Sequence, residues 1–268
     1  MTHNTFLIIV LDAADHLDTE FDPVEWERRP VWQSEPEHGL KAREMGRTPT
    51  PTNLTLPATF SARLFDGARK VHLDAGQTLF LVGDPGDGCY WVDEGLLKVH
   101  VISPSGRDRI LAILGAGTIV GELSMFDGAP RSASVVAIRA SKLSFVSRAI
   151  FDEVLHAHPE FYRELTIILA RRLRDIDDAI AATSFLSVKG RAARALLALA
   201  DAFGQDVGGG RIVIRQKVTQ SDIAAMAGVV RENFSRVMHD WLDRSFVSRK
   251  AGYYCVENKS VLEHEGDF

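Results

Sequence analysis

One segment of the chain has the composition of an anion-binding loop. It reads Gly121-Glu122-Leu123-Ser124-Met125-Phe126-Asp127-Gly128-Ala129-Pro130-Arg131-Ser132-Ala133-Ser134-Val135. Gly121 begins a turn whose backbone amides can face an anion, Arg131 can meet a phosphate with a planar fork of donors, and Ser132 adds a hydroxyl donor. Glu122 can accept a hydrogen bond from a ribose hydroxyl. These residue types indicate a ribose phosphate, with a structural Glu–Arg ion pair as the alternative.

A second group of charged side chains opens a predicted helix, Val230–Asp243, which follows a shorter predicted helix, Gln220–Met226. Gly228 supplies the tight turn between them. Arginine suits the O6/N7 edge of guanine and glutamate accepts from the amino group of cytosine, so this helix can read a G·C-containing half-site. A surface ion pair between Glu232 and Arg236 is the alternative. We predict DNA contacts from Thr219 (which also caps the first helix), Arg231, Glu232, Asn233, Ser235 and Arg236.

Short apolar runs separated by glycines surround the anion-binding segment, from Val71 to Val146. Many short strands with frequent turn signals predict an antiparallel barrel or roll. The expected strands are Thr78–Val82, Cys89–Val92, Leu96–Ile102, Arg109–Leu114, Ser134–Ala140 and Lys142–Ser147.

Helical periodicity follows the roll, with a short helix expected at Ala149–His156 and a long one from Pro159 to about Ser184. Apolar or small side chains recur along the long helix at three- and four-residue spacing, as in a coiled-coil seam. They are Tyr162, Leu165, Leu169, Leu173, Ile176, Ile180 and Thr183. The stripe predicts a dimer contact, with packing of the helix on its own roll as the alternative.

The C-terminal section combines a helix at Gly190–Phe203 ended by Gly204, a strand at Arg211–Arg215, the two short helices, and a hairpin. The hairpin joins Phe246–Ser248 to Tyr253–Val256, and the whole order predicts a winged helix-turn-helix. The expected fold class is therefore α+β. Its parts are an acidic, flexible N-terminal extension (1–54), an antiparallel, jelly-roll-like β-roll (55–148), a short and a long helix (149–186) and a winged domain (187–268).

Composition narrows the class of protein. A hydrophobic fraction of 46% with 25% charged residues is ordinary for a folded chain. Cys89 and Cys255 are the two cysteines, too few for a disulfide framework or an iron–sulfur cluster, and no metal is expected. No apolar run approaches the roughly 20 residues of a membrane helix. No Lys or Arg precedes the early run Phe6–Leu11, so we expect a cytoplasmic protein with no membrane partner.

Charge is unevenly distributed along the chain. Residues 1–50 carry a net charge of −5, whereas residues 207–252 hold eight Lys or Arg against four Asp or Glu. This basic excess points to an anionic partner near the C-terminus.

The chain has no nucleophile elbow, phosphate loop or His-Glu-x-x-His motif, so we do not expect an enzyme. One hypothesis is that translation begins at Met45, just before the boundary of the extension, and an intact-mass measurement of the native protein would test it.

A family resemblance follows from the motifs above. Gly-Glu-Leu-Ser-Met followed by Ala-Pro-Arg-Ser-Ala-Ser-Val resembles the phosphate-binding cassette of cyclic-nucleotide-binding domains. With the roll, the long helix and the winged domain, the resemblance covers about residues 57–256 and indicates the Crp/Fnr family of transcription regulators. It implies a homodimer that binds double-stranded DNA, cyclic AMP as the allosteric ligand, and contact with RNA polymerase.

The resemblance implies ligand contacts from Gly121, Glu122, Leu123, Ser124, Arg131, Ser132, Arg172 and Asp177. The two hydroxyl residues that touch adenine in the relatives fall on Ile176 and Asp177, counted back without gaps from Phe185-Leu186. This is a departure, because isoleucine cannot hydrogen-bond and an ionised aspartate only accepts. Family frequency favours cyclic AMP. Cyclic GMP is the alternative, since a carboxylate can accept both N1–H and N2–H of guanine, and a solvated Asp177 with no ligand role is a third reading.

The Arg-Glu-x-x-x-Arg pattern of the recognition helix is similar to that of relatives that read TGTGA-like half-sites. We therefore predict that cyclic AMP favours dimer binding to a palindromic TGTGA-like site. Val230 departs from the serine that usually caps this helix, and losing such a cap costs about 1 kcal/mol. Arg249 and Lys250 in the wing are candidate phosphate contacts. The alternative function is a Crp/Fnr-type regulator that senses another signal; haem is not expected, because His156 and His158 resemble ordinary helix-end histidines.

Overall fold

A computed structural model describes residues 56–267 of the chain. The predicted extension of residues 1–54 and the alternative start at Met45 lie outside the described residues. Among the described helices, none is both long enough and apolar enough to cross a bilayer.

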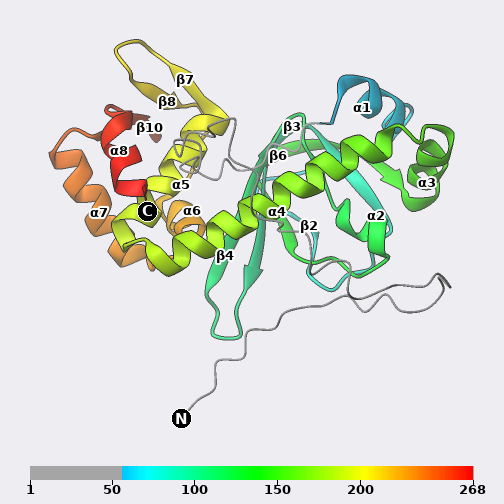
Figure 1. Cartoon of the computed structure of the whole chain (residues 1–268), viewed down its shortest axis with the longest axis horizontal. Helices are drawn as coiled ribbons and strands as arrows, with labels where there is room; N and C mark the ends of the chain where they lie inside the picture. Colours follow the sequence, from blue (N-terminus) through cyan, green and yellow to red (C-terminus); the bar gives the residue numbers. More distant parts are fainter. Residues whose placement is uncertain (1–55, 268) are drawn as a thin grey trace, which may run out of the picture. The chain divides into compact units, whose positions relative to one another are not determined.

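An antiparallel sheet forms the roll and confirms the predicted architecture (Figure 1). Its strands run in the order β1-β6-β3-β4, with β2 paired to β6 and β5 paired to β3. The bounds are β1 (Arg69–Leu73), β2 (Thr78–Phe80), β3 (Gly88–Ile102), β4 (Asp108–Gly115), β5 (Ile119–Val120) and β6 (Ser134–Ser147). The short strands β1 and β5 were not predicted from the sequence.

Two pairs of predicted strands are in fact two continuous strands, β3 and β6, which pair with each other along their length. The register between them shifts from Val92 to Leu97. Gly95 lies in this stretch with φ +116°, and a Cβ atom there would collide with Ser141 of the opposite strand. Gly95, which separates the predicted strands Cys89–Val92 and Leu96–Ile102, therefore lies in a β-bulge. The bulge bends β3 but does not end its pairing with β6.

Helices close one end of the roll. α1 (Ala58–Leu64) packs beside α3 (Arg148–Ala157), and α4 (Phe161–Phe185) starts next to them (Figure 1). Phe60 of α1 stacks on Phe161 of α4 with ring centroids 4.2 Å apart, inside a cluster that also holds buried residues of the roll. α3 and α4 agree with the predicted helices within a few residues, whereas α1 and the short helix α2 (Leu123–Asp127) were not predicted.

The C-terminal section is a winged helix-turn-helix, as predicted. Its helices are α5 (Val188–Phe203), α6 (Gln220–Ala227), α7 (Arg231–Asp243) and α8 (Lys259–Gly266). Its sheet has the order β7-β8-β10-β9, formed by β7 (Gly204–Asp206), β8 (Ile212–Ile214), β9 (Val247–Lys250) and β10 (Tyr253–Val256). Gly204 ends α5 as expected but also begins β7, and α8 was not predicted.

One apolar core joins the roll to the winged section. It buries Leu96, Ile110 and Ile113 of β3 and β4 together with α5, α6 and α7, where Phe234 and Trp241 are fully buried. The β4 strand packs directly on α6, the first helix of the helix-turn-helix. The strands β3 and β4 of the roll and the two helices of the helix-turn-helix therefore share one hydrophobic cluster.

Candidate functional site

Arg131 is the central cation of the predicted anion-binding segment, and it is buried, with 3% of its surface exposed. Its Nη1 donates to the carbonyl of Gly121 at 2.7 Å, and its Nη2 donates to the carbonyl of Gly88 at 2.7 Å and to Asp87 at 3.0 Å. The guanidinium lies over the Phe80 ring, 4.4 Å from its centroid. Its Nε is buried and has no hydrogen-bond partner among the described residues. Three of the five N–H donors of the guanidinium therefore hold the side chain in place.

Gly121 is needed where it stands for two reasons. Its φ of +81° lies in the region that favours glycine, and a Cβ atom there would lie 2.6 Å from Nη1 of Arg131. A side chain at this position would strain the turn and displace the guanidinium. The predicted role of this glycine as the start of the turn is consistent with that geometry.

Glu122 forms an ion pair, but not with Arg131. The carboxylate is buried, with 1% of the residue exposed, and its Oε1 accepts from Nη1 of Arg172 on α4. The alternative of a structural ion pair between Glu122 and Arg131 is therefore wrong, because Arg131 pairs with Asp87 and Glu122 pairs with Arg172 of the long helix. The sequence placed Arg172 near the ligand, and the structure brings it to Glu122.

Arg148, at the start of α3, holds the short helix α2 that follows Glu122. Its guanidinium donates to the carbonyl oxygens of Ser124, Gly86 and Met125, the last two at 3.2 Å. Gly86 approaches Ser124 so closely that a Cβ atom at Gly86 would overlap the serine side chain. The sequence analysis missed Arg148, because its partners lie more than twenty residues away along the chain.

A cavity of about 740 Å³ connects these residues with α4 and the winged section. Six of the predicted ligand residues, together with Arg172, line it; they are Gly121, Glu122, Leu123, Ser124, Arg131 and Ser132. Asp177 does not line it and is exposed on α4, whereas Asp175 and Ile176 do. Residues two apart on a helix point about 200° away from each other, so the two aspartates face different surroundings. Within one chain, the structure does not bring Asp177 to the ligand site.

The Asp175 carboxyl has a perturbed acidity. Burial and the neighbouring Asp178 raise its pKa to about 6, against the opposing influence of Arg172 and Arg174. A carboxyl at the wall of the cavity is therefore part-protonated near pH 6.

The helix-turn-helix begins with a complete capping box. The Thr219 side chain accepts from the backbone N–H of Asp222, and the Asp222 carboxylate accepts from the backbone of Thr219. Gly228 ends α6 in the left-handed conformation, as the predicted tight turn requires. Val230 stands at the N-cap of α7 without a side-chain hydrogen bond, which agrees with the departure seen in the sequence.

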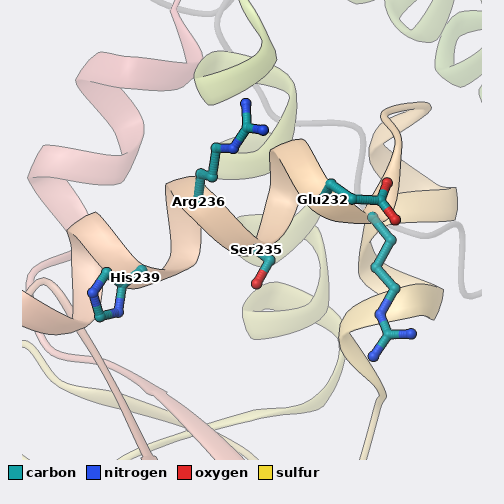
Figure 2. Close-up of a pocket in the computed structure, with 5 residues that line it drawn as sticks. Glu232, Ser235, Arg236 and His239 are labelled. Atoms are coloured by element: carbon teal, nitrogen blue, oxygen red, sulfur yellow. The ribbon is translucent and has the colours of Figure 1, made fainter.

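The first two turns of α7 present an open polar surface to solvent (Figure 2). A shallow depression on it is lined by Arg231, Glu232, Ser235, Arg236 and His239. Figure 2 shows the Glu232 and Arg236 side chains extending in different directions, and no ion pair joins them within the described residues. Asn233 is half-buried and does not line the depression. His239 was missed, although its position four residues after Ser235 puts it on the same face.

The predicted apolar stripe of α4 divides into two parts. Leu165 is buried against the roll with 2% exposure, whereas Leu173 and Ile180 are 60% and 61% exposed. The first turns therefore pack on the chain's own roll, and the later turns carry apolar side chains that residues 56–267 leave exposed. The dimer contact through these later turns stays a prediction.

The two helix-end histidines have local partners. His156 Nδ1 lies 2.7 Å from the carbonyl of Asp152, and His158 contacts Arg63 and Glu160. Among residues 56–267, no group of three or more His, Cys, Asp or Glu side chains is arranged to hold a metal ion.

Comparison with protein families matches residues 70–158 to the cyclic nucleotide-binding domain and residues 190–265 to the Crp-like helix-turn-helix domain. Neither match is to a catalytic family. The chain is 34% identical over 201 residues to the CRP-like cAMP-activated global transcriptional regulator of Mycobacterium tuberculosis, covering 75% of this chain and 86% of that protein. It is 31% identical over 194 residues to the cyclic AMP receptor protein of Thermus thermophilus, covering 70% and 83%.

Solved structures share the fold. FixK2 from Bradyrhizobium japonicum superposes with a TM-score of 0.66 at 19% identity, covering 75% of this chain and 98% of that one. The c-di-GMP responsive regulator CLP of Xanthomonas campestris superposes with a TM-score of 0.63 at 20% identity, covering 75% and 99%. At such identities the likeness concerns the fold alone.

Proposed function

Because the chain belongs to the Crp/Fnr family of DNA-binding transcription regulators, we propose that cyclic AMP binds in its roll and strengthens the binding of a homodimer to a palindromic TGTGA-like site. One observation carries the proposal: a buried arginine with a spare donor and a buried glutamate line the same cavity as the helix that leads to the winged domain.

The chemistry of the cavity suits a ribose cyclic phosphate. The phosphate would accept from Arg131, whose guanidinium is already oriented by Gly121 and Gly88. A ribose hydroxyl would donate to Glu122. Since Glu122 is paired with Arg172, the ligand must share or displace that bond, and Arg172 belongs to α4. The ion pair is thus a physical link through which nucleotide binding can shift the long helix and the domain that follows it.

The base is the least determined part of the ligand. Cyclic AMP is proposed because the two relatives above carry it in their names. Cyclic GMP remains the second candidate, favoured by a carboxyl at the cavity wall: Asp175, in place of the expected Asp177, could accept from the N1–H and N2–H of guanine once ionised.

DNA reading is proposed for the exposed face of α7. Arg231, Glu232 and Arg236 have no ion-pair partner among the described residues, so their donors and acceptors are available to base edges. Thr219 and the wing residues Arg249 and Lys250 would contact phosphates.

The exposed stripe around Leu173 and Ile180 would pair two long helices, and the two winged domains would then meet half-sites about one helical turn apart. Such a regulator would act in the cytoplasm and contact RNA polymerase.

Calorimetric titration tests the ligand and its coupling to DNA. The full chain is titrated with cyclic AMP and with cyclic GMP, each with and without a palindromic TGTGA duplex at one stated salt concentration. A duplex with scrambled half-sites is the control. We expect tighter binding of the specific duplex with cyclic AMP, and tighter cyclic AMP binding with that duplex. Tighter DNA binding with cyclic GMP alone would reassign the ligand. DNA binding without heat from either nucleotide would overturn the nucleotide-responsive function and favour a regulator that senses another signal.

Sedimentation tests the dimer independently of both ligands. Leu173 is exposed on α4 and does not line the cavity, so Leu173→Glu should dissociate the dimer while nucleotide binding persists. Arg171→Glu, on the same helix, is the control for added negative charge. A monomeric wild-type chain would overturn the proposed dimer.

A further inference from the structure

The nucleotide cavity has a second basic wall that the cyclic phosphate does not use. Arg109 of β4 lines the cavity, as do Arg191 and Arg194 of α5. These arginines lie between the roll and the helix-turn-helix, since Met226 and Ala227 at the end of α6 line the same cavity. None of them belongs to the anion-binding segment around Arg131.

The three arginines differ in the partners of their guanidinium groups. The Nε of Arg194 donates to the carbonyl of Gly266 at 2.7 Å, so this side chain serves the packing of α8. Arg109 and Arg191 make no side-chain hydrogen bond and no ion pair with any residue between 56 and 267, and Nε of Arg191 is buried. Burial and the charge of Arg191 lower the pKa of Arg109. Two like charges are thus held close together with no counter-charge.

Carboxyl groups do not supply the missing counter-charge. Glu122, which also lines the cavity, is already paired with Arg172. Asp175, the other described carboxyl of the lining, faces the charges of Arg172 and Arg174 on its own helix. Asp108, beside Arg109, is engaged by Lys98 and His100 at 3.1 Å and 2.7 Å. An anion from solution is therefore the natural partner for the two free guanidinium groups, because each offers a planar fork of donors suited to a tetrahedral oxyanion.

We propose that Arg109 and Arg191 form a second anion site, for inorganic phosphate or the phosphate group of a small metabolite, between the roll and the helix-turn-helix. At this position a bound anion would affect the placement of the recognition helix. A Cβ atom at Gly228 would overlap the Arg109 guanidinium, so this cation lies directly against the turn before the recognition helix. An anion held there would tie β4 to α5 and α6 and fix the winged domain against the roll. The proposal does not depend on which cyclic nucleotide occupies the first site.

Inorganic phosphate is the probe, and the Arg131→Ala variant of the full chain is the background, because Arg131 could bind phosphate too. Thermal unfolding is measured as phosphate replaces chloride at constant ionic strength. Arg109→Gln and Arg191→Gln are each added to this background. Arg107→Gln is the matched control, since Arg107 is an exposed arginine two residues from Arg109.

We expect phosphate to raise the unfolding midpoint of the Arg131→Ala protein and of its Arg107→Gln derivative. The phosphate concentration that gives half of this effect should rise at least tenfold in the Arg109→Gln and Arg191→Gln derivatives. Without phosphate, Arg191→Gln should unfold at the same or a higher temperature than its parent, because it relieves repulsion; a lower midpoint would indicate a structural arginine and overturn the site. A phosphate effect that disappears with Arg131→Ala alone, or that survives both glutamine substitutions unchanged, would also overturn it.

Discussion

The cassette and the recognition helix use the same residue types in opposite ways. In the cassette, Glu122 and Arg131 are at most 3% exposed, and each already has a protein partner. On α7, Arg231, Glu232 and Arg236 are exposed and have no ion-pair partner within residues 56–267. The two proposed ligand sites thus differ: the charges of the cassette are already removed from water, whereas those of α7 are in contact with it.

That difference teaches how the two sites can communicate. A ligand bound as proposed in the cassette would exchange partners with groups that hold the fold together, so its binding would reach Arg172 and α4. The proposed DNA-reading face of α7 would exchange only water, and its affinity would depend on where the whole helix is placed against DNA. The buried site is suited to sensing and the exposed site to reading. The predictions below test this contrast, from the largest expected effect to the smallest.

Removing the buried arginine should give the largest effect. Arg131→Ala deletes a charge-assisted donor to the phosphate, which contributes about 1.5–3 kcal/mol and corresponds to a roughly tenfold to 150-fold loss of nucleotide affinity. Calorimetry measures it. Arg139→Ala, an exposed arginine of β6, is the control and should change affinity little. Unchanged nucleotide affinity in Arg131→Ala would refute the site.

Removing an exposed arginine should act on DNA alone. Arg236→Ala loses one base contact worth about 1–3 kcal/mol, so affinity for the specific duplex should fall roughly fivefold to 150-fold while the scrambled duplex is bound nearly as before. Fluorescence anisotropy with both duplexes measures this. Lys250→Ala in the wing should instead weaken both duplexes equally and reduce the salt slope by about 1. Equal loss on both duplexes for Arg236→Ala would place Arg236 on phosphate.

Alanine substitutions at two glycines distinguish the cost of backbone strain from an effect on nucleotide binding. Gly121 and Gly117 have φ of +81° and +85°, so alanine at either position should cost about 1–2 kcal/mol of folding stability. The Cβ of Gly121→Ala would press on Arg131, whereas that of Gly117→Ala would meet nothing within 4 Å. Only Gly121→Ala should therefore weaken nucleotide binding, as calorimetry would show. Equal nucleotide affinity of the two variants would contradict this account of Gly121.

Restoring the missing cap should stabilise the winged domain modestly. Val230→Ser supplies an acceptor for the first turn of α7 and should add about 1 kcal/mol to the free energy of unfolding. Chemical denaturation measures it. Val207→Ser, a similarly exposed valine outside any helix cap, is the control. A change no larger than that of the control would mean that the first turn of α7 is satisfied in another way.

The smallest effect concerns pH. Because burial and Asp178 raise the pKa of Asp175 to about 6, the folded chain holds a proton there that the unfolded chain releases near pH 4. Stability should therefore fall as pH rises from about 4 to about 6. Asp175→Asn should remove this slope and unfold at a higher temperature than the wild type at pH 7.5. Asp177→Asn, on the exposed side of α4, is the control. A slope that persists in Asp175→Asn would assign it to another group.

Local patterns made the architecture predictable. Glycine-separated apolar runs predicted the roll, three- and four-residue spacing predicted α4, and the order of helix, strand, helix pair and hairpin predicted the winged domain. The misses were short or ambiguous elements. β5 spans only Ile119–Val120, and Gly95 was interpreted as the end of a strand because a bulge and a turn use the same residue. A single sequence does not distinguish those two uses.

The sequence by itself determined the types of chemistry present: a cassette with an acid and a base nine residues apart, and a recognition helix with its charges on one face. Only the tertiary structure decided the partners. It joined Glu122 to Arg172 rather than Arg131, turned Asp175 rather than Asp177 toward the cavity, and set Arg109 beside Arg191. Periodicity specifies which residues share a face of one element. The packing of that element on distant parts of the chain decides what the face meets, and no local spacing encodes it.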